Sequence, residues 1–294
     1  MKSDLSDKIL KYFSWFCTII LLGALSAVIG FLILKGYKSI NLNLVFADTP
    51  PMDAILLKKQ VFDGLFPAIA GTLSLIFLSI IFAIPAGLAT GIFLAEYCPL
   101  KIKWLFNLLF DILAGIPSIV VGLFGFSITI FIHHYFFDKL FPCLLISALC
   151  LAFLVLPYII RTTQISLEAV LFSVRVTAPV LGATKLQNLF FVLLPASLSG
   201  IISGIILSIG RCAEDTAVIM LTGAVATAGV PKSIFSNFEA LPFYIYYISS
   251  QYTDNKELMT GFGACLILLF ICTGLFVLAH FIKRKLSNKI LYKP

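Results

Sequence analysis

Six long apolar runs, separated by short polar stretches, restrict this chain more strongly than any other feature of its sequence. Of its 294 residues, 60% are hydrophobic and only 12% are charged, and the mean hydropathy is +1.06. A soluble domain has no core large enough to bury that much apolar surface. About 20 apolar residues in a helix cross a bilayer core of roughly 30 Å. We therefore expect an all-α polytopic membrane protein with six transmembrane helices, near residues 15–34, 67–96, 104–132, 142–160, 198–224 and 260–282.

The polar stretches divide the chain into three parts. Residues 1–66 supply an N-terminal tail, the first span and an outer loop, residues 67–282 supply a core of five spans, and residues 283–294 form a basic tail. A signal peptide cleaved near Ala27 is the rival interpretation of the first apolar run. The run continues beyond that residue, which favours an uncleaved span.

The distribution of Lys and Arg predicts how the chain is oriented in the membrane. Six spans place both termini on one side, and that side carries thirteen of these residues against seven on the other. Cytoplasmic loops are enriched in Lys and Arg, so both termini and the loop 161–197 are expected in the cytoplasm. The stretches 35–66 and 225–259 are then exposed outer loops. The same rule explains the net charge of +7, and no basic stripe interleaved with aromatic residues indicates nucleic-acid binding.

Two short amphipathic helices are predicted within the loop 161–197. Apolar residues recur there at i, i+3, i+4 and i+7, at Leu167, Val170, Leu171 and Val174 and again at Leu186, Leu189, Phe190 and Leu193. Gly182 permits a sharp turn between the helices, and Thr184 followed by Gln187 fits a capping box. Pro195 is expected to end the second helix. Such a hairpin either packs beneath its own bundle or fits a groove on a separate protein.

Helix-breaking residues fall inside the second and third spans. Pro85 predicts a kink in the second span, and Gly87 and Gly91 allow a neighbouring helix to approach closely. The stretch 115–118 of the third span reads Gly-Ile-Pro-Ser at mid-membrane depth, where unpaired backbone must face protein or water. This segment either serves helix packing or bends the helix so that it lines a pathway.

Three charged residues lie close together within the fifth span. Arg211 can pair with Glu214 at i+3 or with Asp215 at i+4 on one helix face. An intramembrane charge costs at least a few kcal/mol, so such residues are normally paired, turned inward and functional. The cluster is therefore either a structural ion pair or part of a translocation path. Asp111 in the third span is a similar residue nearer an interface.

The loop 161–197 resembles a signature of bacterial ABC-importer permeases. Ala178, Gly182 and the sequence Val-x-Leu-Pro at 192–195 keep the spacing of the EAA signature, EAA-x3-G-x9-I-x-LP, although Val176 and Thr177 replace its Glu and first Ala. The resemblance implies a type I importer permease fold in which this loop docks in a cleft of a cytoplasmic ATPase. The residues then implied in ATPase coupling are Ala178, Gly182, Ala183, Thr184, Leu194 and Pro195.

Further segments are similar to the permeases of phosphate uptake. The stretch 115–124 looks like their GIPSI segment, and the stretch 211–223 looks like the R-x-x-G-E-T-A-P segment, with Glu214 in place of Gly, Asp215 in place of Glu and Val218 in place of Pro. Residues 238–242 look more like the A-type subunit than its C-type partner. The resemblance implies a phosphate importer with a C-type permease, an ATPase dimer and an extracytoplasmic phosphate-binding protein. The residues implied in the translocation path are Arg211, Glu214, Asp215, Thr216, Ser118 and Asp111.

The sequence offers no route by which this chain would bind a nucleotide or a metal ion itself. It contains no Gly-x4-Gly-Lys-[Ser/Thr] loop, so we expect ATP and magnesium on the partner ATPase and no cofactor on this chain. Its seven cysteines form no C-x-x-C pair and predict no metal site. We expect a non-catalytic subunit in the cytoplasmic membrane of a bacterium or archaeon. The alternatives are a permease for sulfate, molybdate or tungstate, an ion-coupled secondary transporter, or an intramembrane enzyme.

Overall fold

Every regular element in the described part of the chain is helical, as the apolar runs predict. The computed structural model describes residues 2–47, 49–56, 61, 64–136 and 141–291. Six segments there are long and apolar enough to cross a membrane, at Asp7–Ser39, Phe66–Glu96, Ser118–Tyr135, Leu144–Glu168, Lys185–Glu214 and Asn255–Leu286. The prediction of an all-α protein with six membrane spans is confirmed.

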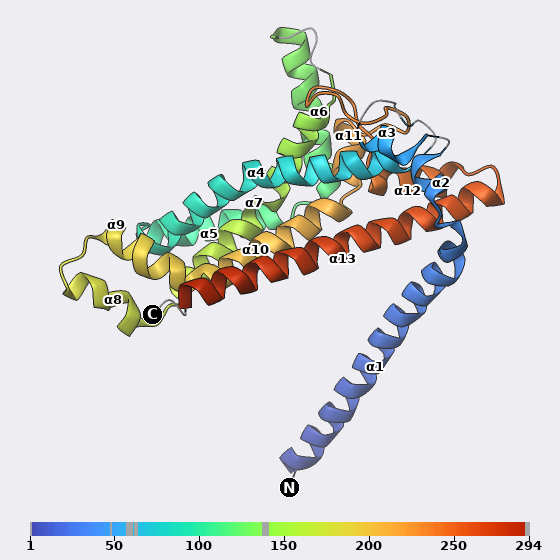
Figure 1. Ribbon diagram of the computed structural model, residues 1–294. Coiled ribbons are helices and arrows are strands. Elements are labelled where there is room, and N and C mark those ends of the chain that lie inside the picture. Colours follow the sequence, from blue (N-terminus) through green and yellow to red (C-terminus); the bar gives the residue numbers. More distant parts are fainter. Residues whose placement is uncertain (1, 48, 57–60, 62–63, 137–140, 292–294) are drawn as a thin grey trace.

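The centre of the bundle is the contact between α4 (Phe66–Glu96) and α7 (Leu144–Glu168), which lie side by side (Figure 1). A Cβ atom at Gly87 would lie 2.6 Å from Cγ2 of Ile159, and one at Gly91 would lie 2.6 Å from Cβ of Thr163. Any larger side chain would push the two helices apart, so glycine at both positions permits their close approach. The expected packing role of this glycine pair is confirmed.

Helix α1 (Lys2–Gly36) leaves the bundle at an angle and meets α13 (Asn255–Leu291) near its own C-terminal end (Figure 1). There the rings of Phe31 and Phe262 pack edge to face, with centroids 5.7 Å apart. The apolar side chains of α1 from Ile9 to Val28 are exposed, as expected of a surface that faces lipid or another chain. Helix α13 continues through residues 283–291 of the predicted basic tail.

The third predicted span is not one helix. It divides into α5 (Leu100–Ala114) and α6 (Ser118–Tyr135), and α6 rises steeply away from α4 and α7 (Figure 1). The break falls at Pro117, whose backbone has φ −57° and ψ 136° and is not helical. Proline lacks an N–H and disfavours helical geometry at the residue before it. The span expected over 104–132 is therefore divided, and the break falls at the Gly-Ile-Pro-Ser segment, where the sequence places helix-breaking residues.

The fifth predicted span is also interrupted. Helix α10 (Leu194–Glu214) ends at Asp215, which has an extended backbone with φ −74° and ψ 121°, and α11 (Ala217–Thr222) follows. Oδ1 of Asp215 accepts a hydrogen bond from the backbone N–H of Val218 at 2.9 Å and so caps the new helix. Residues 198–224 contain enough apolar residues for one span. The chain forms two helices there because the carboxylate of Asp215 caps the second one.

Neither outer stretch is a simple exposed loop, contrary to the prediction. The short helices there are η1 (Tyr37–Ser39), α2 (Leu42–Phe46), α3 (Pro51–Ile55) and α12 (Leu241–Gln251). Leu65 and Leu241, each at most 1% exposed, pack with Ala68 of α4 and Ala264 of α13. Phe238 is completely buried in the main core. The apolar side chains within these polar stretches therefore close one end of the bundle.

A buried carboxylate holds the segment before α12 in place. Oε1 of Glu239 accepts hydrogen bonds from the backbone N–H groups of Ala228 at 2.9 Å and Gly229 at 2.8 Å. Burial raises the pKa of Glu239 above its ordinary value of 4.5, and the two N–H donors partly oppose that shift. The backbone of this segment is fixed further by a hydrogen bond from the N–H of Leu241 to Oγ1 of Thr72 in α4, at 2.9 Å.

Candidate functional site

The turn between α8 (Phe172–Val180) and α9 (Lys185–Asn188) is built around Gly182, as predicted. Gly182 has φ +87°, a conformation that costs residues with a Cβ roughly 1–2 kcal/mol. Its N–H donates to the carbonyl of Pro179 at 3.0 Å, and the N–H of Ala183 donates to the carbonyl of Ala178 at 3.0 Å. These two bonds form a Schellman motif, so the fixed spacing from Ala178 to Ala183 is the spacing of a helix C-cap.

The capping box predicted at the start of α9 is present. Oγ1 of Thr184 accepts from the N–H of Gln187 at 3.3 Å, and Oε1 of Gln187 accepts from the N–H of Thr184 at 2.8 Å. The Schellman motif and the capping box together fix both sides of the turn through local bonds. We call residues 172–188 the hook.

Pro195 does not end the helix that follows the hook, contrary to the prediction. The chain stays helical from α9 through a π-helical turn at Leu189–Leu193 and into α10. In this turn the N–H of Leu194 bonds to the carbonyl of Leu189, five residues back. The wider turn leaves room for the proline ring, which would otherwise clash with the carbonyl four residues before it. The loop residues 189–197 are therefore helical.

The first of the two predicted apolar stripes is also wrong. Leu167 belongs to the last turn of α7, whereas Val174 belongs to α8, so the spacing crosses a helix boundary. Beneath the hook, Leu167 packs with Leu189 and Leu193. The apolar side chains on the outer surface of the loop, by contrast, are 71–82% exposed, at Leu171, Phe172, Val180, Leu181 and Phe191. This uncovered surface has the character of a protein-docking site.

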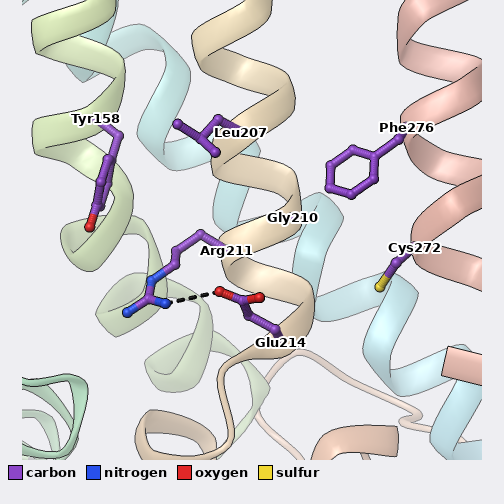
Figure 2. A pocket seen from close by; sticks show the side chains of 7 residues that line it. All are labelled: Tyr158, Leu207, Gly210, Arg211, Glu214, Cys272 and Phe276. Carbon is purple, nitrogen blue, oxygen red and sulfur yellow. Dashed lines mark hydrogen bonds and ion pairs between the residues drawn. The ribbon is translucent and has the colours of Figure 1, made fainter. Parts of the chain in front are cut away.

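A second candidate site surrounds Arg211 near the end of α10. Figure 2 shows its guanidinium beside the carboxylate of Glu214, and Nη1 of Arg211 lies 2.9 Å from Oε1 of Glu214. The cavity beside this pair has a volume of about 410 Å³. Its lining residues come from α7, α10 and α13, and they are Tyr158, Leu207, Gly210, Arg211, Glu214, Cys272 and Phe276.

The two acidic residues predicted to pair with Arg211 have different positions. Glu214 makes the ion pair, and its side chain is 63% exposed. Asp215 is only 6% exposed and caps α11 through Val218. The predicted cluster is therefore divided into an accessible ion pair and a buried helix cap.

The remaining predicted path residues lie outside the described lining of this cavity. Ser118 begins α6, and Gly122 lies one turn further on the same face, where a Cβ would approach the carbonyl of Ala217 to 3.1 Å. Thr216 comes immediately before Ala217, so Ser118 and Thr216 lie near the starts of two helices that pack together. Asp111 is exposed on α5.

Sequence reasoning missed the residues that α7 and α13 contribute to the Arg211 cavity. Tyr158 follows Pro157 within α7, and a hydroxyl inside an apolar span is a signal that a search for charged residues overlooks. Phe276 approaches α10 closely because Gly210 has no side chain. A Cβ at Gly210 would lie 2.5 Å from Cζ of the phenyl ring. That contact is not visible in the spacing of either segment.

The described residues contain no group of three or more His, Cys, Asp or Glu side chains that could hold a metal ion. The family model for binding-protein-dependent transport system inner membrane components matches residues 87–288. This match covers most of the chain, including the hook and the Arg211 cavity. The chain belongs to that family. It is a permease, the membrane subunit of an ABC importer.

Curated relatives of this permease match it over most of its length. The phosphate transport system permease protein PstA of Haemophilus influenzae is 29% identical over 95% of this chain and 95% of its own length. A protein of the same name from Xylella fastidiosa is 31% identical over 82% of this chain and 79% of its own. The probable ABC transporter permease protein YqgI of Bacillus subtilis is 24% identical over 91% of this chain and 92% of its own.

Solved structures share the fold of this permease at low sequence identity. A chain of the MetNI methionine ABC transporter in an inward-facing conformation aligns with a TM-score of 0.59 and 18% identity, over 81% of this chain and 99% of that chain. A chain of a bacterial ABC transporter involved in the import of alginate aligns with a TM-score of 0.60 and 15% identity, over 90% of this chain and 95% of that chain. The fold is that of a type I ABC importer permease. Subunits of this kind are not catalytic, because the ATPase is a separate chain.

Proposed function

We propose that this permease forms half of the translocation path of an ATP-driven importer of inorganic phosphate. The observation that carries the coupling part is the exposed apolar surface of the hook, which local hydrogen bonds hold in one shape. Permeases of this family work with an ATPase and a binding protein, and a shaped apolar projection fits a groove on such a partner. The coupling residues are then Ala178, Gly182, Ala183, Thr184, Leu194 and Pro195.

The hook and both termini face the cytoplasm in this proposal. The excess of Lys and Arg on the side of the termini, thirteen against seven, supports that orientation in a cytoplasmic membrane. ATP and magnesium bind to an ATPase dimer and not to this chain. The other partners are a C-type permease, an extracytoplasmic phosphate-binding protein and the lipid bilayer.

Phosphate is the proposed cargo because relatives bearing the name of a phosphate transport permease match most of the chain. The Arg211 cavity supports an oxyanion, since its lining includes a guanidinium and Tyr158, whose hydroxyl can donate a hydrogen bond, around a space of about 410 Å³. Arginine recognises the oxygens of such anions with paired N–H donors. Another oxyanion, such as sulfate or molybdate, is the second candidate that the same cavity fits.

The proposed mechanism is alternating access driven from the hook. ATP-dependent closure of the ATPase pair moves the hook, and helices that continue from it, above all α10, reorient around the path. The breaks before α6 and α11 are the positions where these spans can bend with least loss of backbone bonding. Arg211 offsets part of the charge of the anion, and Glu214 limits how tightly it is held. Thr216, Ser118 and Asp111 complete the proposed path, and Asp215 supports it as the cap of α11.

Reconstitution of the complete complex in lipid vesicles tests this proposal. Vesicles that hold the two permeases and the ATPase, supplied with phosphate-loaded binding protein, should accumulate phosphate only when ATP is present on the ATPase side. Accumulation without nucleotide, or by this permease alone, would reject ATP coupling in favour of ion-coupled transport.

The same vesicles test the cargo. Loading the binding-protein side with phosphate, sulfate or molybdate in parallel should give ATP-dependent accumulation of phosphate. Accumulation of sulfate or molybdate without phosphate would retain the importer and reject phosphate as its cargo.

A further inference from the structure

Helix α8 occupies a defined place at the end of the bundle although none of its side chains is buried. Its apolar residues Phe172, Val174 and Val180 are exposed, so burial of an apolar face does not hold it. Some other interaction must connect α8 to the spans.

Arg175 makes that connection. Its Nη1 lies 2.5 Å from Oε1 of Glu96, the last residue of α4, and its Nη2 donates to the carbonyl of Leu167 in α7 at 2.5 Å. The side chains of Arg175 and Glu96 are only 24% and 19% exposed. The two Nη groups of one guanidinium therefore join α8 to two spans by charge-assisted hydrogen bonds in a partly buried environment.

The backbone of the same residue is tied to the far side of the hook. Nδ2 of Asn188, at the end of α9, donates to the carbonyl of Arg175 at 3.0 Å. Asn188 is 7% exposed and lies directly before the π-helical turn that leads into α10. Arg175 is thus the point at which α8 contacts α4, α7 and the start of the α10 segment.

A second ion pair extends this network to α5. Nζ of Lys103 lies 2.5 Å from Oε1 of Glu168 at the end of α7, and Glu168 also accepts from Nε2 of Gln164 at 3.0 Å. The ends of α4, α5 and α7 nearest the hook are therefore joined through polar contacts, and Arg175 is the member of this network that lies on α8.

We infer that Arg175 is a positioning residue that transmits movement of the hook to α4 and α7, an inference that rests on the proposed coupling to an ATPase. A hook without this side chain can still present its exposed apolar surface to the ATPase. Its displacement would no longer be passed to the spans through the guanidinium, so ATP would be hydrolysed with less transport.

The test compares Arg175→Ala and Glu96→Gln with the unmodified permease in the complete reconstituted complex. Two quantities are measured, namely the amount of ATPase that co-purifies and the phosphate accumulated per ATP hydrolysed. We expect normal co-purification and a transport ratio lowered at least about fivefold, the lower end of ordinary coupling effects between sites. Arg175→Lys, which keeps the positive charge but loses the planar fork, should retain an intermediate ratio.

Three outcomes would overturn the inference. The first is a ratio within about twofold of the unmodified complex in both single variants. The second is a ratio in Arg175→Lys that is lower than the ratio in Arg175→Ala. The third is a loss of assembled complex with an unchanged ratio in what remains, which would indicate a merely structural role.

Lys101→Ala is the matched control, because it removes one positive charge from an exposed site on α5 and leaves α8 untouched. Failure of the unmodified complex to accumulate phosphate would reject the proposed function and is distinguishable from failure of this inference.

Discussion

Nη1 of Arg211 and Oε1 of Glu214 lie 2.9 Å apart across one turn of α10, and both side chains border the same cavity. They are 42% and 63% exposed, and ion pairs of this kind contribute only about 0.2–1 kcal/mol to stability. Both residues lie on α10, so the pair does not join two helices. Arg211 remains able to exchange Glu214 for another anion.

Replacing the acid should strengthen the hold of the cavity on its anion. In Glu214→Gln the guanidinium loses its competing carboxylate, so we expect a KM for phosphate about two- to fivefold lower, in line with the modest strength of the pair. A slower maximal uptake should accompany it, because release becomes harder. Uptake kinetics in the reconstituted complex measure both values, and a raised KM would contradict this prediction.

Removing the cation should have a larger effect than removing the acid. Arg211→Ala leaves Glu214 as the unopposed charge in the cavity, and we expect phosphate uptake to fall by about tenfold or more. Arg211→Lys keeps the charge but loses the planar fork and should retain an intermediate rate. Equal amounts of assembled complex must be confirmed for each variant. Unchanged uptake in Arg211→Ala would exclude this residue from the path.

The conformation of Gly182 can be tested separately from its size. A Cβ at this position meets no atom within 4 Å, so Gly182→Ala acts through its positive φ alone. The strain of roughly 1–2 kcal/mol predicts ATPase binding weakened by about five- to thirtyfold. Gly182→Asn should bind better than the alanine variant, since Asn adopts this conformation more readily. Gly274→Ala, in an open position of α13, is the control, and binding is measured in detergent by titration with purified ATPase.

The contact between α4 and α7 should tolerate no added methyl group at its narrowest points. Gly91→Ala would bring its Cβ against Thr163, and we expect destabilisation of about 1–3 kcal/mol, the usual effect of overpacking. The midpoint of thermal denaturation in detergent measures this. Gly23→Ala, where a Cβ meets nothing within 4 Å, should leave the midpoint nearly unchanged. Equal midpoints for both variants would show that the helices separate easily.

The outer segment around Glu239 should loosen as the pH rises. The pKa of Glu239 is higher in the folded protein than its ordinary value of 4.5, so the folded state binds the proton more tightly than the unfolded state. Its contribution to stability is complete below pH 4.5 and is lost as the pH rises through the folded pKa.

Glu239→Gln should abolish this dependence, because the amide oxygen can still accept from Ala228 and Gly229 without carrying charge. Hydrogen exchange of residues 225–241 compares the two proteins across that range, corrected for the intrinsic rate at each pH. A difference in corrected exchange rate between the two proteins that stays constant with pH would contradict the prediction.

Local spacing was sufficient to predict several features of the fold and the hook. The apolar runs located six spans because each helix must satisfy its own backbone in lipid. The turn at Gly182, the capping box at Thr184 and the pairing of Arg211 with Glu214 depend on residues at most five positions apart. Short-range hydrogen bonds of this kind are fixed by the sequence that contains them.

The errors share a different physical origin. An apolar count cannot distinguish one span from two helices joined at a buried cap, and Asp215 is such a cap. Whether Pro195 ends the helix depends on the π-helical turn before it. The spacing from Leu167 to Val174 is the same whether or not a helix ends between them. Tyr158 and Phe276 meet Arg211 only because three helices pack together, which no single segment reveals.

The bonds that shape the turn of the hook at Gly182 all arise within residues 178–187, so the form of this turn does not wait for a partner. A projection that is rigid before the encounter loses little conformational entropy on docking. An ATPase would then bind a preformed surface. The association rate would be governed by collision and orientation and not by folding of the loop.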